Sequence, residues 1–266
     1  TRKESSAASD VYKRQILAHT PHIPDGCQWG TFLRNHDELT LEMVTEEDRH
    51  YMWEEYAPES RWRCNLGIRR RLSPLVDNDD AKIRLLNAML LSLPGSPVLY
   101  YDDEIGMGDD PWLPDRDGVR TPMQWDDSET AGFSTALPED FHLPLIRTFG
   151  HDPEHVNVAR QMDDPSSLLV WTRAMLGIRR HHPVFGTGEF TDLGGPDMAV
   201  MSFLRHNEHE TVLCLANFSD TERMVALHLP QFAGMTGSSL IHGQDAQPVK
   251  ADGTLSVPLW PCLLYT

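Results

Sequence analysis

The run FLRNHDE at residues 32–38 puts a histidine and two carboxylates directly after two apolar residues. Phe32 and Leu33 favour a strand, and the polar side chains that follow need either solvent or a pocket. A solvated loop is the usual interpretation of a lone His-Asp pair. The alternative is a strand that delivers His36 and Asp37 into a site, where the carboxylate accepts hydrogen bonds from a ligand.

A second run, DRDGVRTPMQWDD at 115–127, combines carboxylates, guanidinium groups and the indole of Trp125. Carboxylates bind sugar hydroxyls, and an aromatic face stacks on the C–H side of a sugar ring. For Arg116 and Arg120, a structural ion pair with Asp115 or Asp117 explains the pattern equally well. The run lacks the ligand spacing and the closing Glu of a calcium loop, and we predict no metal site.

These residues need elements that position them. The composition predicts a strand over 29–35, a helix within 41–56 capped by Thr45, a loop over 64–75, a helix over 77–93 and a buried strand over 96–101. A further polar cluster, 102–104, follows this last strand. Strands that alternate with helices indicate β/α units with a parallel sheet, whose functional side chains lie at the carboxyl ends of the strands.

The rest of the chain changes character twice. The irregular stretch 109–157 is long enough to be functional or a subdomain, and a helix capped by Ser166 or Ser167 follows within 165–185. Four strand-like runs then follow one another, at 199–206, 211–219, 224–230 and 238–243. They predict an antiparallel β-sandwich over 187–261, after an α/β domain over 16–186.

Several long runs in this order carry a family resemblance: FLRNHDE, RDGVRTPMQWD, CNLGIRRRLSPLVDND, LLSLPGSPVLYYDDEIGMGD and DPSSLLVWTRAM. FLRNHDE resembles the fourth conserved region of the α-amylase family of glycoside hydrolases. The set as a whole resembles the branch of that family that interconverts maltose and trehalose. The resemblance covers residues 16 to about 243 and implies the C-terminal part of a (β/α)8 TIM barrel followed by the β-sandwich.

The resemblance also implies a retaining mechanism, in which an Asp nucleophile forms a glycosyl-enzyme and a Glu serves as acid/base. Asp37 matches the third carboxylate, which stabilises the transition state, and His36 is its hydroxyl-binding neighbour. Glu38 and Arg116 would close the pocket, with Arg120 and Trp125 as further substrate contacts. No residue before the first strand matches the nucleophile or the acid/base, so both are expected upstream, as is any calcium site of the parent protein. No cofactor is expected here.

One position departs from the family pattern. The family has YYGDE where this chain reads YYDDE, with Asp102 in place of glycine. Glycine allows a positive φ or a close approach of the backbone. Asp102 tolerates the left-handed region, but its added carboxylate alters the local loop.

Two other functions fit parts of the pattern. An α-glucosidase or oligo-1,6-glucosidase shares the RTPMQW motif and differs in using water as the acceptor. A non-catalytic amylase-like module, such as a transporter heavy chain, typically loses the motif residues. Retention of Asn35, His36 and Asp37 therefore favours an enzyme.

Composition excludes several classes. The net charge of −17 argues against a nucleic-acid binder, and no apolar run reaches the length of a membrane span. The cysteine spacing gives neither a disulfide framework nor a zinc site, which favours free thiols and a cytoplasmic location. We expect a disaccharide as the partner, and the resemblance allows a homo-oligomer of the parent protein.

The two ends of the chain have an unusual origin. GATGTGTATAAGAGACAG encodes DVYKRQ at 10–15, and its reverse complement encodes CLLYT at 262–266. Both resemble a transposon-end sequencing adapter translated in frame. We therefore predict that 1–15 and 262–266 are adapter sequence, that the remainder is an internal fragment, and that the fragment alone is inactive and poorly stable.

Overall fold

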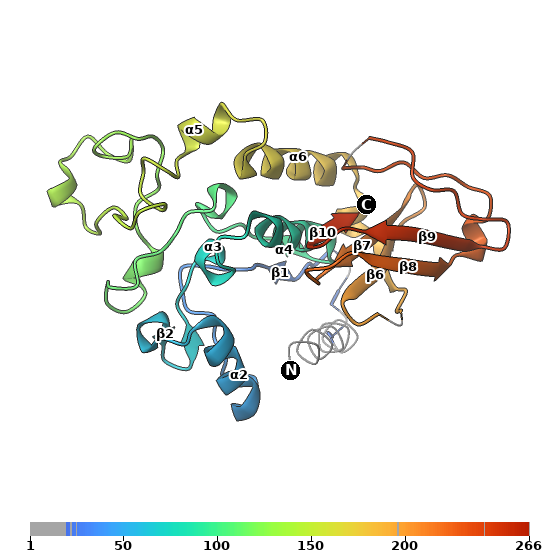
Figure 1. Cartoon of the computed structure of the whole chain (residues 1–266), viewed down its shortest axis with the longest axis horizontal. Coiled ribbons are helices and arrows are strands. Elements are labelled where there is room, and N and C mark those ends of the chain that lie inside the picture. Colours follow the sequence, from blue (N-terminus) through green and yellow to red (C-terminus); the bar gives the residue numbers. More distant parts are fainter. Residues whose placement is uncertain (1–19, 22, 25, 196, 242, 266) are drawn as a thin grey trace. The chain divides into compact units, whose positions relative to one another are not determined.

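The computed structural model describes residues 20, 21, 23, 24, 26–195, 197–241 and 243–265 (Figure 1). The predicted adapter at 1–15 lies outside these residues. Contacts divide the chain into two compact units. We call the first the sheet unit: the described part of Thr1–Thr31, with Arg84–Pro97 and Met175–Thr266. The second, the loop unit, comprises Phe32–Ile83 and Val98–Ala174.

The sheet unit contains a short parallel pair, β1 (Gly30–Thr31) with β4 (Ser96–Pro97). Gly95 has φ +121°, and a Cβ built on it would lie 2.8 Å from the Trp29 carbonyl oxygen, so only glycine fits there. Both strands are far shorter than the sequence predicts, because a strand extends only as far as its partner's backbone does.

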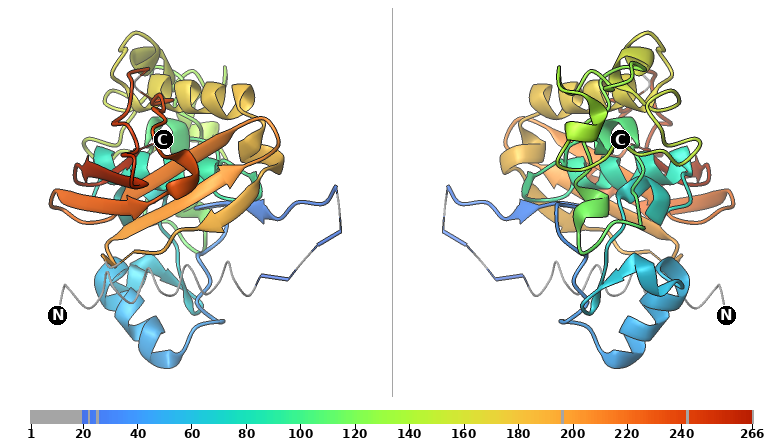
Figure 2. Two further views of the ribbon diagram at one scale, coloured as in Figure 1. Left: turned by 90° about the vertical axis from the view of Figure 1, so that its right-hand side faces the viewer. Right: turned by 90° about the vertical axis from the view of Figure 1, so that its left-hand side faces the viewer.

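The remaining strands of the sheet unit are antiparallel, as predicted (Figure 2). One sheet has the order β10-β7-β6-β5, and the other pairs β8 with β9. The bounds are β5 Glu189–Asp192, β6 Val200–His206, β7 Thr211–Asn217, β8 Arg223–His228, β9 Thr254–Leu259 and β10 Leu263–Tyr265. Alternate residues of β8 and β9, including Val225, Leu227, Leu255 and Leu259, are buried in one apolar core with Val200 and Leu215.

Two details of this sheet differ from the expected strands. The predicted strand at 238–243 is wrong: its described residues form a single bridge, Ser238 to Asp245, and a turn closed by Gly243 N–H on the Ser239 carbonyl. Ser, Gly and Thr around it favour turns over a ladder. Conversely, residues 263–265, set aside as adapter, form β10 and pair with β7 at Leu263↔Asn217. Their origin stays a prediction.

Two arginines from other elements donate hydrogen bonds at the C-terminal end of helix α4 (Asp80–Ser92). Arg179, on α6 (Leu168–His181), donates to the carbonyls of Leu91 and Gly95, the latter at 2.8 Å. Arg205, on β6, donates to the Ser92 carbonyl at 2.6 Å. The last carbonyls of a helix have no intrahelical donor, and cations suit the negative end of its dipole. The pKa of Arg205 is lowered to about 10 by burial, so its guanidinium stays charged at neutral pH.

The loop unit has little regular structure. Its helical elements are α2 Glu46–Tyr56, η1 Ser60–Trp62, α3 Leu72–Leu75, η2 Asp103–Ile105, η3 Asp117–Val119, η4 Pro138–Asp140 and α5 Val158–Met162; η5 Pro230–Phe232 and α7 Val184–Thr187 belong to the sheet unit. The predicted cap of α2 is confirmed, since the Asp48 N–H donates to Thr45 Oγ1 at 3.1 Å. Ser167 caps α6, because the Val170 N–H donates to its Oγ at 3.2 Å.

The segment 64–75, predicted as a loop, is instead a hairpin followed by α3. Strands β2 (Arg63–Cys64) and β3 (Gly67–Ile68) pair across a two-residue turn, and Asn65 has φ +51°. Asparagine tolerates this left-handed conformation better than most residues. The predicted buried strand at 96–101 is confirmed only as the short strand β4, and its burial is wrong, because Val98 is 54% and Tyr101 37% exposed.

Candidate active site

The polar run of residues 34–38 is fixed by its own backbone and by β3. Asn35 Oδ1 accepts from the Asp37 N–H at 2.9 Å, and Asp37 Oδ1 accepts from the Glu38 N–H at 2.9 Å. Leu39 and Ile68 exchange backbone hydrogen bonds of 2.8 and 3.0 Å. The segment is thus a turn held by side-chain-to-backbone hydrogen bonds, with one bridge to the neighbouring hairpin.

Arg34 is buried beneath this turn. Its Nε donates to the Arg70 carbonyl at 2.6 Å and its Nη2 to the Ile68 carbonyl at 3.0 Å. A longer contact of 3.5 Å joins Nη2 to the Asp37 carbonyl. Burial lowers the pKa of Arg34 to about 10. Arg34 therefore stays a cation at neutral pH and supports the turn from below.

Arg116 joins the two carboxylates of the run. Its Nε donates to Asp37 Oδ1 and to Glu38 Oε2, the latter at 2.7 Å, and its Nη1 donates to Asp115 Oδ1 at 2.7 Å. Hydrogen bonding to the Glu38 side chain and then to Arg116 holds the pKa of Asp37 well below its ordinary value. The same carboxylates raise the pKa of Arg116. With 44% of its side chain exposed, Asp37 is an ionised carboxylate that a ligand can reach.

The hairpin β2–β3 contributes a residue that the sequence analysis missed. Asn65 Nδ2 donates to Glu38 Oε1 at 2.8 Å. A Cβ on Gly67 would lie 2.4 Å from the Leu39 carbonyl oxygen and 2.6 Å from Glu38 Cγ, so this approach requires glycine. The Asn-x-Gly spacing was the available signal for a tight turn, but it does not say what the turn contacts.

The other predicted site residues are placed less directly. Arg120 Nε donates to the His36 carbonyl at 2.8 Å and lies 4.0 Å from Asp117, so it supports the backbone of the run. The His36 side chain is exposed. Trp125 is 49% exposed, and its backbone bonds to Ala131 and Ala159. The structure thus groups Asp37, Glu38 and Arg116, and Trp125 makes its described contacts elsewhere.

Asp102, in place of the family's glycine, adopts the left-handed conformation with φ +73°. Its carboxylate is fully buried and lies 3.4 Å from Arg71 Nη2, while Arg71 Nη1 donates to the Tyr101 carbonyl at 2.7 Å. Burial raises the pKa of Asp102 and of Asp103 to about 7, against the opposing effect of Arg71. The cluster is buried, which gives it a structural role, and its two carboxyl groups have unusually high pKa values.

The other two arginines of the IRRR run are also structural. Arg69 donates to the carbonyls of Arg61, Pro111, Leu113 and Asp115, with distances of 2.7 Å to Arg61 and to Leu113. Arg70 forms a 2.9 Å ion pair with Asp109. Arg69 thereby fixes the loop that carries Arg116.

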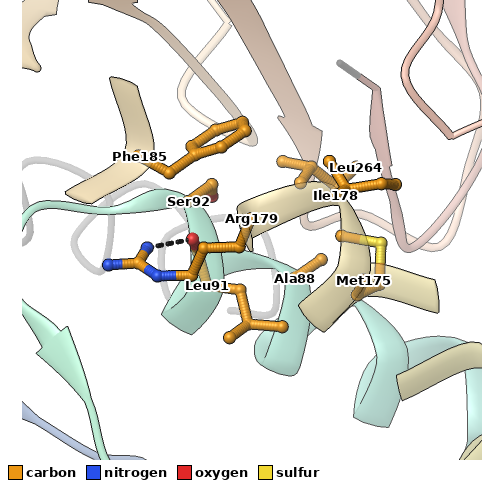
Figure 3. Close-up of a pocket in the computed structure, with 8 residues that line it drawn as sticks. All are labelled: Ala88, Leu91, Ser92, Met175, Ile178, Arg179, Phe185 and Leu264. Atoms are coloured by element: carbon orange, nitrogen blue, oxygen red, sulfur yellow. Dashed lines mark hydrogen bonds between the residues drawn. The ribbon is translucent and has the colours of Figure 1, made fainter. Parts of the chain in front are cut away.

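A cavity in the sheet unit does not fit a sugar. It measures about 10 Å³, room for one water molecule at most. Its lining comes from α4, α6, α7 and β10 (Figure 3): Ala88, Leu91, Ser92, Met175, Ile178, Arg179, Phe185 and Leu264. Within the described ranges, no group of three acidic, His or Cys side chains could hold a metal ion, and no helix has the length and apolar character of a membrane span.

The family model described as "Alpha amylase, catalytic domain" matches residues 3–188. The chain belongs to the α-amylase family. A second model, "Maltogenic Amylase, C-terminal domain", matches residues 193–262. Both matches agree with the order of the two expected domains.

Two curated relatives and one solved structure extend this finding. The chain is 55% identical over 233 residues to a trehalose synthase of a Pimelobacter species, covering 86% of this chain and 41% of that protein. It is 54% identical over 225 residues to a trehalose synthase/amylase of Mycobacterium tuberculosis, covering 84% and 37%. The trehalulose synthase of Pseudomonas mesoacidophila matches with a TM-score of 0.58 at 24% identity, covering 89% of this chain and 42% of that one.

The chain therefore spans about two fifths of the length of these relatives. Its fold is the C-terminal part of a (β/α)8 barrel followed by an antiparallel β-sandwich domain. The predicted fold class is confirmed.

Proposed function

We propose that the chain is part of an enzyme that interconverts maltose and trehalose by intramolecular glucosyl transfer with retention. The observation that carries this proposal is the Asp37–Glu38–Arg116 cluster, present in a chain 55% identical to a protein named trehalose synthase. A non-catalytic module has no need to keep an exposed, ionised carboxylate within a motif turn.

Asp37 has the properties that its role requires. A carboxylate with a depressed pKa stays charged and accepts hydrogen bonds from two vicinal hydroxyls of the glucosyl ring. These bonds strengthen as the ring distorts toward the oxocarbenium-like transition state. His36, exposed beside it, donates to a further hydroxyl, and Arg120 and Trp125 contribute more distant substrate contacts.

The remaining steps belong to residues upstream of this segment in the whole protein. An Asp attacks the anomeric carbon and a Glu protonates the departing oxygen, which releases glucose and leaves a glycosyl-enzyme. The retained glucose then turns and attacks the same carbon through another hydroxyl, which breaks the bond to the Asp and frees its carboxylate, while the Glu takes up the proton of the attacking hydroxyl. Glu38 and Arg116 close the pocket so that glucose, rather than water, is the acceptor.

The alternative acceptor is water, as in an α-glucosidase. The relative from Mycobacterium tuberculosis is named both synthase and amylase, so this alternative has a specific basis in the comparisons. Both functions use a transition-state-stabilising carboxylate at the position of Asp37, and they differ in whether water or the retained glucose accepts the glucosyl group.

The test begins with the flanking DNA, which would supply the upstream reading frame and show the origin of residues 1–15 and 262–266. The longer protein is then incubated with maltose, and trehalose and glucose are quantified. Trehalose as the main product supports the proposal, and glucose alone replaces it with an α-glucosidase. The chain by itself is the control, and we expect it to convert no maltose.

We also propose a domain boundary at 186/187 and a cytoplasmic location. The first family match ends at residue 188 and the second begins at residue 193, both close to this boundary. All four cysteines are free thiols, Cys27 in an exposed position, which fits a reducing compartment. Fractionation of the source cells, followed by an assay for maltose conversion, tests the location.

A further inference from the structure

The hairpin β2–β3 and Arg116 each bond to a different oxygen of Glu38. Glu38 Oε1 accepts from Asn65 Nδ2 at 2.8 Å, and Oε2 accepts from Arg116 Nε at 2.7 Å. Only 10% of the Glu38 side chain is exposed. Each oxygen of this carboxylate therefore has its own partner, and the two partners come from segments about 50 residues apart.

The hairpin is itself fixed against the segment that carries Glu38. Leu39 and Ile68 exchange two backbone hydrogen bonds, and Gly67 approaches the Leu39 carbonyl more closely than any residue with a Cβ could. Asn65 occupies the turn with φ +51°, so its amide is presented by a constrained backbone rather than by a flexible loop. A donor held in this way restricts the rotamer of Glu38.

We infer that Asn65 is a positioning residue, which holds the Glu38 carboxylate in place for Arg116 and thereby determines whether retained glucose or water accepts the glucosyl group. This inference rests on the proposed function. Arg116 bonds to Glu38 and Asp37 through the same nitrogen, so a displaced Glu38 carboxylate also displaces the guanidinium from Asp37. A loosened contact between Glu38 and Arg116 admits water to the glycosyl-enzyme while the catalytic groups stay in place.

The test compares Asn65→Gly with Asn78→Gly in the longer protein. Both asparagines have a positive φ, +51° and +58°, which glycine adopts without strain, so the backbone effect is matched. Asn78 accepts from Ser73 Oγ at 3.0 Å and has no described bond to the cluster. Initial rates of trehalose and glucose formation from maltose are measured for each variant, together with thermal unfolding.

We expect Asn65→Gly to raise the ratio of glucose to trehalose about fivefold, since it removes a hydrogen bond to a charged group. Total maltose consumption should stay within about threefold of wild type, and Asn78→Gly should leave the ratio unchanged. Asn65→Asp, which sets a second carboxylate against Glu38, should raise the ratio further.

An unchanged ratio in both Asn65 variants, with trehalose made by the wild type, would overturn the inference and leave the proposed function intact. A wild type that makes no trehalose would overturn the proposed function itself. A ratio that rises equally in Asn65→Gly and Asn78→Gly would show a general loosening of the fold and would also reject the positioning role.

Discussion

Two clusters in the loop unit combine arginine with aspartate, and their carboxylates respond in opposite ways. Asp37, with 44% of its side chain exposed, has a depressed pKa beside Glu38 and Arg116. Asp102, with none exposed, has a pKa raised to about 7 although Arg71 lies 3.4 Å away. Hydrogen bonding to the Glu38 side chain and to Arg116 lowers the pKa of the first carboxylate, whereas burial raises that of the second despite Arg71. An arginine is therefore not sufficient to keep a carboxylate charged, and only the exposed carboxylate is available to a ligand.

The largest expected effect is on the exposed cluster. On the proposed function, Asp37→Asn in the longer protein should lower kcat about a thousandfold, because the amide keeps the shape and loses the charge proposed to stabilise the transition state. Steady-state kinetics on maltose give the value. Asp102→Asn serves as the control and should retain most activity. Comparable losses in both variants would show that the buried carboxylate also acts on the substrate.

Removing the cation of the buried cluster should lower the stability of the fold rather than the catalytic rate. Arg71→Met leaves Asp102 buried without its cation and removes one of the two arginines that act on Asp103, and it should lower the free energy of unfolding by about 3–5 kcal/mol. The loss should be greater at pH 8 than at pH 5, where both carboxyls are protonated. Urea unfolding measures it, with Arg61→Met, a partly exposed partner of Glu59, as a control expected to lose less than about 1 kcal/mol.

The pH dependence of unfolding distinguishes the two clusters. Asp102 has a pKa of about 7 when folded and close to its ordinary value of 3.8 when unfolded. The unfolded chain releases this proton first, so the contribution of Asp102 to stability falls as pH rises from about 4 to 7. Asp102→Gly, which fits φ +73°, should reduce this decline by about 1 kcal/mol per pH unit. An unaltered slope would place the titration on another group, such as Asp103.

The smallest expected effect concerns the outermost partner of Arg116. Asp115 is 54% exposed, and its ion pair with Arg116 is one of three that the guanidinium makes. Asp115→Asn should change kcat on maltose by less than about twofold, since exposed pairs contribute little. A larger change would mean that Asp115, like Asp37, takes part in the reaction. Exposure alone would then not distinguish the functional carboxylates from the others.

Local features of this chain could be predicted from sequence, and distant ones could not. The Thr45 cap and the helix at 80–92 depend on residues within one or two turns, so composition and spacing were sufficient. Strand lengths were overestimated because they depend on partners elsewhere in the chain. Asp102 adopts the left-handed conformation that the sequence analysis said an aspartate tolerates, although the sequence did not predict it.

The candidate site could likewise be predicted from the sequence only in part. The family resemblance associated the adjacent residues Asp37 and Glu38 with Arg116, which is about 80 residues further along the chain. Neither the role of Arg34 as a support nor that of Asn65 as a donor to Glu38 could be predicted, because each depends on contacts with segments 27 to 36 residues away. An arginine or asparagine at a given position does not reveal which distant carbonyl or carboxylate it will bind.

The two arginines at the end of α4 have a consequence for synthesis on the ribosome. The carbonyls of Leu91, Ser92 and Gly95 are bonded by Arg179 and Arg205, which are translated 84 to 113 residues later. Until residue 179 has left the exit tunnel, the carbonyls of Leu91 and Gly95 have only water as a partner, and the Ser92 carbonyl has only water until residue 205 has left it. The nascent helix must therefore wait for the C-terminal sheet, and a ribosome that stalls before residue 205 would present α4 with a frayed end to chaperones and proteases.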